Sequence, residues 1–161
     1  MKTCLERIQS LAHQTGVPLE TQRHREVYTM QQVAAELHEK GAHVAKVVIA
    51  QADDSLVMLV LAAPDHVDFD AARAVLGAQH VLPVPESGFR DRFPDCAPGA
   101  MPPFGKFYDM RTLLDEGLAQ TETIVFQAGT HRETIKMATR DYIRLAIPEI
   151  ARFVYAPAHV Q

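Results

Sequence analysis

Two apolar runs near the middle of the chain constrain the fold more than any other feature. Val44–Ala50 and Leu56–Ala63 are dense in β-branched and aliphatic residues, and each has the length of a strand. Ala52-Asp53-Asp54-Ser55 separates them with small and acidic residues that favour a turn. The pattern predicts a buried β-hairpin, and neither run approaches the roughly 18 apolar residues of a membrane span.

Helical periodicity appears on both sides of this hairpin. Apolar residues at helical spacing predict helices over 3–14, 29–40 and 68–76, and a further helix after residue 139. A glycine follows each of the first three, at Gly16, Gly41 and Gly77, where it favours a helix end. Residues 19–28, 81–84 and 123–127 are predicted to be extended. Helices interleaved with adjacent hairpin-like strands indicate an α+β fold with a mixed sheet.

Prolines and glycines concentrate in one segment. Six of the ten prolines and three of the eight glycines fall between Pro83 and Gly105. Proline removes a backbone donor and fixes φ, so this segment cannot be one regular element. We interpret it as a shaped loop within a single domain that spans residues 1–161, rather than as a linker between two cores.

Composition limits the classes of function. The 161 residues are 47% hydrophobic and 22% charged, and the formal net charge is -4, which offers no bulk attraction to DNA or to an anionic membrane. Cys4 and Cys96 are too few for a disulfide framework, which favours a reducing compartment. The charged N-terminus is not that of a secretory signal, so we expect a cytoplasmic protein.

Lys46 is the most informative single residue. It interrupts an otherwise apolar strand, where burying an unpaired ammonium would be costly. Its side chain must therefore reach water, an acid or a ligand, and snorkelling from a strand edge is the alternative to a ligand role.

Several other patterns carry weaker signals. Gly99–Lys106 resembles a phosphate-binding loop only loosely, because the spacing is one residue too long and Phe107 replaces the hydroxyl residue. His38 and His43 are five residues apart and would diverge on a helix, so no metal site is predicted. The charges Arg132, Lys136, Arg140 and Arg144 would form a basic stripe on a continuous helix, whereas a strand over 134–138 would break it up.

Together these pieces resemble the YbaK family, which is similar to the editing domain inserted in bacterial prolyl-tRNA synthetases. The resemblance rests on a helix ending near Gly41 that leads to Val44-Ala45-Lys46-Val47-Val48, and on a loop Gly99-Ala100-Met101-Pro102-Pro103-Phe104-Gly105 that matches G-x-x-x-P. Asp109 and Gly129-Thr130-His131 complete it. It covers most of the chain, and the order and spacing of the parts agree.

The resemblance implies a fold, an activity and a set of site residues. The implied fold is a mixed, largely antiparallel sheet curled into a barrel-like core with flanking helices. The implied activity is hydrolysis of the ester in mischarged tRNA, most simply Pro-type tRNA, by a stand-alone deacylase without metal or cofactor. The resemblance assigns catalysis to Lys46, Gly99 and Ala100, and substrate binding to Met101, Pro102, Pro103, Gly129 and His131.

Partners follow from the same resemblance. A negatively charged chain grips tRNA poorly, so we expect help from Arg23, Arg25, Arg132 and Lys136, or from an aminoacyl-tRNA synthetase. Two alternatives stay open. One is a non-catalytic sensor of the same fold for an amino acid or nucleotide end, and the other is a hydrolase in which His131 activates Cys96.

Overall fold

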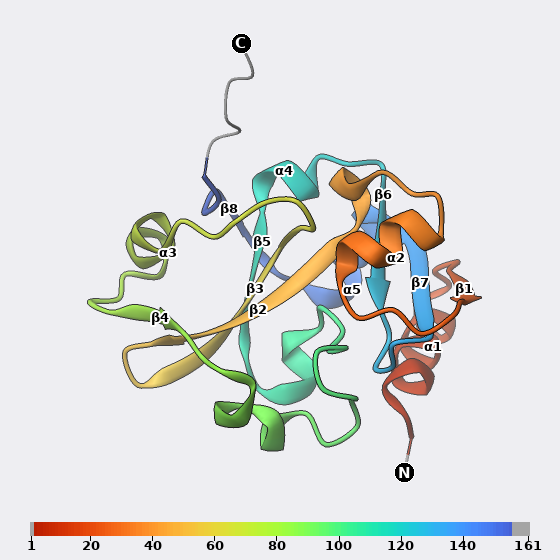
Figure 1. Cartoon of the computed structure of the whole chain (residues 1–161), viewed down its shortest axis with the longest axis horizontal. Helices are drawn as coiled ribbons and strands as arrows, with labels where there is room; N and C mark the ends of the chain where they lie inside the picture. The colour runs from red at the N-terminus through yellow and green to blue at the C-terminus, as the bar shows by residue number, and fades with distance from the viewer. Residues whose placement is uncertain (1, 156–161) are drawn as a thin grey trace.

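The computed structural model describes residues 2–155, in which eight strands form two sheets (Figure 1). A five-stranded sheet has the order β4-β2-β3-β5-β8, and a three-stranded sheet has the order β1-β7-β6. The strands are β1 Glu20–Arg23, β2 Ala45–Ala52, β3 Ser55–Ala62, β4 Val81–Pro83, β5 Arg111–Asp115, β6 Thr123–Gln127, β7 Glu133–Ala138 and β8 Glu149–Ala151. The α-helices are α1 Cys4–Thr15, α2 Met30–Glu36, α3 Phe69–Leu76, α4 Glu116–Ala119 and α5 Thr139–Ala146.

The predicted hairpin is confirmed and forms the centre of the larger sheet. β2 and β3 pair antiparallel over their full length, from Ala45 opposite Ala62 to Ala52 opposite Ser55. Alternate residues of these strands enter two apolar clusters on opposite faces, because successive side chains of a strand point to opposite sides. Both faces are therefore covered, which explains why the two runs are almost continuously apolar.

The remaining pairings give the mixed, largely antiparallel arrangement that the family resemblance implies, and they include two strands that the sequence did not predict, β5 and β8. β5 pairs parallel with β3 and with β8. It lies inside the sheet, although its sequence is short and has a charged residue at each end, Arg111 and Asp115. Burial of Leu113 on one face and Leu114 on the other stabilises it, and only the tertiary structure supplies those contacts.

The two sheets meet at one point and do not close into a barrel. A single parallel bridge joins Val44, just before β2, to Val125 in β6. Beyond this bridge the strands diverge, and β2 crosses the molecule while β6 runs down beside β7 (Figure 1). The predicted barrel-like core is thus two sheets that share one corner.

Helix ends follow their capping residues, with one correction. α1 and α3 end at Gly16 and Gly77, both in the left-handed conformation, as predicted. α2 ends at Glu36, five residues before the predicted end at Gly41. His38 takes the left-handed conformation with φ 55°, and the Glu39 amide donates to Ala34, so a histidine serves where glycine is usual. A separate 3-10 turn, η1 Gly41–His43, follows.

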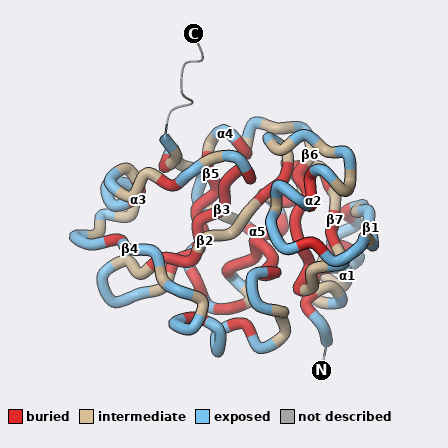
Figure 2. The backbone as a smooth tube through the Cα atoms, in the orientation of Figure 1, coloured by how far each residue is buried: buried red, intermediate tan, exposed pale blue. Residues whose placement is uncertain are grey.

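The Pro/Gly-rich segment forms turns that pack onto the core. It contains the 3-10 turns η2 Glu86–Gly88 and η3 Arg90–Arg92 and leads into η4 Gly105–Tyr108. Phe89, Phe93 and Phe104 from this segment are buried in the largest apolar cluster. Figure 2 shows buried backbone at the centre of the molecule and exposed backbone on the outer faces of the helices. No helix within residues 2–155 is long and apolar enough to cross a membrane.

Candidate functional site

The structure joins the Gly99–Pro103 loop to the Gly129–His131 segment, and it places Lys46 near the corner that the two sheets share. Val44 and Val125 form a parallel bridge, so the residues two positions further, Lys46 and Gln127, lie on the same face as the bridge. Val44 and Val125 pack there in an apolar cluster that includes Ala34 of α2. Val48 and Ala50, which share this face of β2 with Lys46, pack in the apolar cluster that contains Ala72 of α3. α2 lies in front of β6 and β7 in Figure 1.

Lys46 is a half-buried cation at this corner. Within residues 2–155 it forms no ion pair. Burial lowers the pKa of Lys46 below its ordinary value, and the nearby Asp65 carboxylate opposes this shift. The pKa of Asp65 is raised, first by its own burial and then by Asp115. For both groups the effect of burial on the pKa is larger than the effect of their mutual attraction. Asp65 is therefore not a close ion-pair partner of the Lys46 ammonium.

The G-x-x-x-P loop begins with a tight turn. Pro98 occupies its second position, Gly99 follows with φ +81°, and the Ala100 amide donates to Ala97 at 3.0 Å. Proline followed by a residue with positive φ is the pattern of a type II β-turn, which requires glycine in the second central position. The Ala100 amide is thus engaged within the turn, whereas the Gly99 amide has no backbone acceptor among the described residues.

Two backbone hydrogen bonds attach this turn to the end of β6. Ala97 donates to the Gly129 carbonyl at 2.8 Å, and Gly129 donates to the Ala100 carbonyl at 2.9 Å. Gly129 has φ +94°, and a Cβ at this position would lie 2.8 Å from the Cβ of Cys4. Glycine is needed here both for its conformation and for the close approach of α1.

His131 links the same two segments through its side chain. Its Nε2 lies 2.6 Å from the Pro98 carbonyl, which only accepts, so Nε2 carries the hydrogen. Its Nδ1 lies 3.4 Å from Nε2 of the buried Gln127, which donates to it in this tautomer. The ring of the exposed Tyr28 lies against the imidazole, with centroids 4.7 Å apart. His131 therefore connects the Pro98–Gly99 turn to the end of β6 through both of its ring nitrogens.

The inner part of the loop is anchored in the core. Met101, Pro102 and Pro103 are all buried. The Pro103 carbonyl accepts a hydrogen bond from the hydroxyl of the fully buried Tyr142 at 2.6 Å. Burial also raises the pKa of Tyr142, so its hydroxyl stays protonated and donates at every pH at which the protein is studied.

Tyr142→Phe is expected to loosen this anchor. It leaves the Pro103 carbonyl buried without a donor, which costs about 1–3 kcal/mol of unfolding free energy. Denaturant unfolding measures this loss, and Tyr155→Phe is the control, because Tyr155 is exposed. Equal stability of both variants would show that the hydrogen bond to Pro103 contributes nothing.

The predicted tRNA-binding residues are close together but mostly paired with acids. β1 pairs with β7, which places Arg23 opposite Glu133. Three of the four cations have carboxylate partners, namely Arg25 with Glu36 at 2.9 Å, Arg132 with Glu26 at 2.9 Å and Lys136 with Glu39 at 2.6 Å. The longer stripe through Arg140 and Arg144 does not exist, because Lys136 lies in a strand and the other two in a helix.

The described residues form neither the alternative Cys96–His131 site nor a metal site. Cys96 contacts Asp95 and Tyr108, whereas His131 contacts Pro98 and Gln127, so these two residues do not form a thiol–imidazole pair. Within residues 2–155, no group of three or more His, Cys, Asp or Glu side chains is placed to hold a metal ion.

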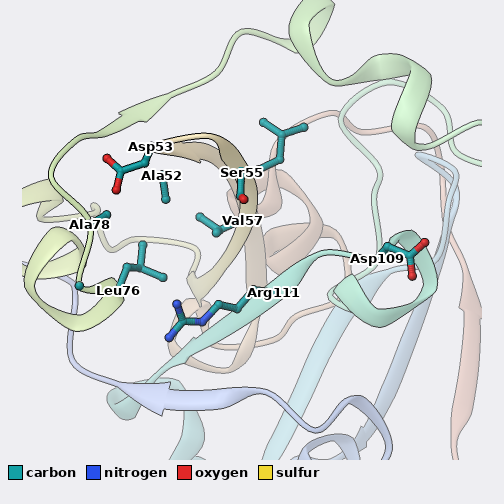
Figure 3. Close-up of a pocket in the computed structure, with 10 residues that line it drawn as sticks. Ala52, Asp53, Ser55, Val57, Leu76, Ala78, Asp109 and Arg111 are labelled. Atoms are coloured by element: carbon teal, nitrogen blue, oxygen red, sulfur yellow. The ribbon is translucent and has the colours of Figure 1, made fainter.

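Two cavities within residues 2–155 are lined in part by residues of the larger sheet. A cavity of about 360 Å³ lies between the β2–β3 turn and α3, and Figure 3 shows Arg111 reaching into it opposite Asp53. At about 3.3 Å per residue along β2, this cavity is roughly 20 Å from Lys46. A second cavity of about 280 Å³ is closer, because Asp65 and Asp115 line it. Neither was indicated by the sequence patterns.

Comparison with solved structures supports the fold. A protein proposed as a trans-editing enzyme for prolyl tRNA synthetase superposes with a TM-score of 0.79 at 15% identity, over 97% of this chain and 99% of that one. The hypothetical protein APE2540 gives a TM-score of 0.84 at 12% identity, over 93% and 100% of the two chains. A proposed signal transduction protein from Marinobacter aquaeolei VT8 gives 0.71 at 13% identity, and the match covers 96% of this chain but 31% of that one.

Sequence comparison identifies the family. No curated protein matches the sequence. Residues 24–145 match the aminoacyl-tRNA editing domain family, and this match includes the Lys46 strand, the Gly99–Pro103 loop and the Gly129–His131 segment. The chain therefore belongs to the aminoacyl-tRNA editing domain family.

Proposed function

We propose that this chain is a stand-alone trans-editing deacylase that hydrolyses the ester between a wrong amino acid and tRNA, with Pro-type tRNA as the first candidate. Membership of the editing family supports an editing role. The observation that supports the specific proposal is Lys46, a half-buried cation without an ion pair in residues 2–155, two residues after the bridge that joins the two sheets. The Gly99–Pro103 loop and the Gly129–His131 segment, which are far apart along the chain, are held together by hydrogen bonds.

The proposed chemistry needs no strong nucleophile from the protein. An aminoacyl ester is already activated, so a positioned water or the neighbouring ribose hydroxyl can attack its carbonyl carbon. The bond to the ribose oxygen then breaks, leaving a free amino acid and tRNA with its terminal hydroxyl. The protein must hold these groups in line and stabilise the negative charge that develops on the carbonyl oxygen.

The backbone amide of Gly99 is the donor that we assign to this oxygen. The amide of Ala100 is engaged with Ala97, so Ala100 contributes by closing the turn that presents Gly99. His131 holds the Pro98 carbonyl and thereby fixes the orientation of the turn. We therefore propose His131 and Gly129 as positioning residues, while Met101, Pro102 and Pro103 shape the aminoacyl subsite.

Lys46 supplies the positive charge of the site. Because it lacks a close carboxylate, its ammonium is available to a terminal phosphate of the tRNA, and a charge-assisted contact in a partly buried site is stronger than one at the surface. Its neighbour Asp65 limits how far the pKa of Lys46 falls. The substrate is thus gripped at its 3′ end.

The direct test is release of amino acid from a panel of charged tRNAs. We expect release from Ala- or Cys-charged tRNA for proline and little release from the correctly charged tRNA. No release from any member of the panel, with binding of aminoacyl-tRNA intact, would replace the deacylase with a sensor of the same fold. Thiol alkylation is expected to leave release unchanged, whereas a Cys96 nucleophile would lose it.

Recognition of tRNA is expected to depend more on Arg23 than on Arg25. Arg23 makes no ion pair with any described residue, whereas Arg25 is held by Glu36. Arg23→Ala should weaken tRNA binding and reduce the slope of log affinity against log salt by about one, the value for one phosphate contact. Arg25→Ala should change both less, and equal slopes for the two variants would contradict this assignment.

The pairing of basic side chains with carboxylates indicates that the chain needs a partner to bind tRNA. A net charge of -4 and ion pairs on Arg25, Arg132 and Lys136 leave little free positive charge to hold tRNA. We therefore propose that a tRNA-bound aminoacyl-tRNA synthetase assists delivery of the substrate.

A further inference from the structure

The two cysteines of the chain meet beneath the functional site, although 91 residues separate them in sequence. Cys4 begins α1, and Cys96 precedes the Pro98–Gly99 turn. Neither has a part in the proposed deacylation, and both are free thiols.

Contacts from several directions define this cluster. Cys4 is buried with 1% exposure, and a Cβ built on Gly129 would lie 3.3 Å from the Cys4 Sγ and 3.4 Å from the Asp95 carbonyl oxygen. Cys4 and Asp95, the residue before Cys96, thus both lie close to Gly129. Cys96 Sγ lies 3.3 Å from the Tyr108 hydroxyl, which donates to Asp95 at 2.9 Å. Hydrogen bonding between the two thiols, followed by burial, raises the pKa of Cys4.

An ion pair holds the two segments in this position. Arg7, one turn after Cys4 in α1, donates to the Asp95 carboxylate at 3.0 Å and to the Phe107 carbonyl at 3.2 Å. Its guanidinium also lies over the Phe107 ring at 4.4 Å. The helix that carries one thiol is therefore fixed against the loop that carries the other.

One thiol of the pair, that of Cys96, is accessible to reagents. Cys96 is partly exposed. A surface cavity of about 320 Å³ is lined by Lys2, Arg7, Pro94 and Asp95, directly beside it in sequence. Asp95 pairs with Arg7, whereas Lys2 has no ion pair within residues 2–155, and this remaining positive charge favours a small anionic reagent over a neutral one.

We propose that Cys4 and Cys96 are a thiol pair that forms a reversible intramolecular disulfide with an anionic low-molecular-weight disulfide as oxidant. The Cys96 thiolate attacks one sulfur of the oxidant, which gives a mixed disulfide and releases one small thiol. Cys4 then attacks the Cys96 sulfur, forms the Cys4–Cys96 bond and releases the second small thiol. The two thiol protons of the protein end on the two released thiols, so the oxidant is reduced by two electrons.

The bond would fasten α1 to the turn of the candidate site. Cys96 is next to Ala97, whose amide donates to Gly129, and Cys4 packs on Gly129 from the other side. The crosslink therefore restrains the Ala97–Ala100 turn through its neighbour. This inference does not depend on the deacylase proposal, because it concerns thiols outside the assigned chemistry.

Oxidised glutathione is the probe for the test. After incubation of the folded chain, we expect both thiols to disappear, the intact mass to fall by that of two hydrogen atoms, and one proteolytic fragment to join Cys4 to Cys96. Dithiothreitol should restore both thiols. Cys4→Ser should instead stop at the mixed disulfide and gain one glutathione on Cys96.

Three outcomes on the wild-type chain would overturn the proposal. They are a stable glutathione adduct on Cys96 with Cys4 still free, a disulfide-linked dimer, and retention of both thiols under conditions in which free glutathione equilibrates. Each is read from the wild-type protein, so the conclusion does not depend on whether a cysteine variant folds.

Discussion

Lys46→Ala is expected to reduce the release of amino acid from mischarged tRNA by about a hundredfold or more while the chain stays folded. Lys46 is assigned to the terminal phosphate and so positions the ester, and misplacement of reacting groups by about 1 Å costs about a hundredfold in rate. The loss follows from the position of Lys46, whose cation is half-buried at the corner of the two sheets and has no close carboxylate. Single-turnover deacylation with the substrate found in the panel measures it.

Stability distinguishes a functional lysine from a structural one. Burial lowers the pKa of Lys46, so the unfolded chain holds the proton more tightly than the folded chain. The resulting cost to stability is fully present below the folded-state pKa and is relieved as pH rises towards the unfolded value. Lys46→Met should therefore stabilise the fold at neutral pH while it removes activity, and this stabilisation should shrink in alkaline buffer.

Lys46→Arg and Lys40→Ala are the matched controls. Lys46→Arg keeps the charge and should retain part of the activity, whereas Lys40 is exposed six residues earlier and its removal should change little. Activity should also fall with rising pH before an ordinary lysine would lose its proton, because the pKa of Lys46 is lowered. Full activity of Lys46→Ala would rule out the assigned role.

Gly129→Ala is expected to give the largest loss of stability among substitutions at the site. Its φ of +94° costs an L-residue about 1–2 kcal/mol, and the added methyl would meet the Cβ of Cys4 at 2.8 Å. Overpacking of this kind adds about 1–3 kcal/mol. A total near 3 kcal/mol is a large part of the stability of a small protein and should be visible in denaturant unfolding.

Gly16→Ala isolates the conformational part of this effect. Gly16 also has a positive φ, of +70°, but a Cβ there would meet no atom within 4 Å. Its substitution should cost only about 1 kcal/mol. If Gly16→Ala and Gly129→Ala lose the same stability, the close packing of α1 on Gly129 is not what excludes a side chain there.

Local sequence predicted the elements whose stabilising contacts are local. The hairpin, α1 and α3 were predictable because strand-length apolar runs and capping residues lie within each segment. α2 was predicted too long, because His38 adopts a conformation usually left to glycine. β5 was missed, because its place between β3 and β8 depends on partners that are distant in sequence.

The candidate site also combines features that the sequence predicted with features that only the structure shows. Family resemblance named Lys46, the Gly99–Pro103 loop and Gly129–His131, because those motifs are contiguous in sequence. It did not reveal that the Ala100 amide is engaged within its turn, or that His131 bonds the Pro98 carbonyl. Gln127 and Tyr28 were missed, since neither belongs to a motif and both are placed by the folding of neighbouring segments.

The sequence by itself determined the α+β class, the hairpin and the motifs of the editing family. Periodicity, helix caps and contiguous motifs each depend only on residues that are close together along the chain. Only the tertiary structure decided which charges are neutralised and which thiols meet. Carboxylates from other segments pair with Arg25, Arg132 and Lys136. Cys4 lies close to Cys96, although 91 residues separate them in the sequence. Such contacts depend on how sheets and helices pack, and they cannot be predicted from the spacing of residues along the chain.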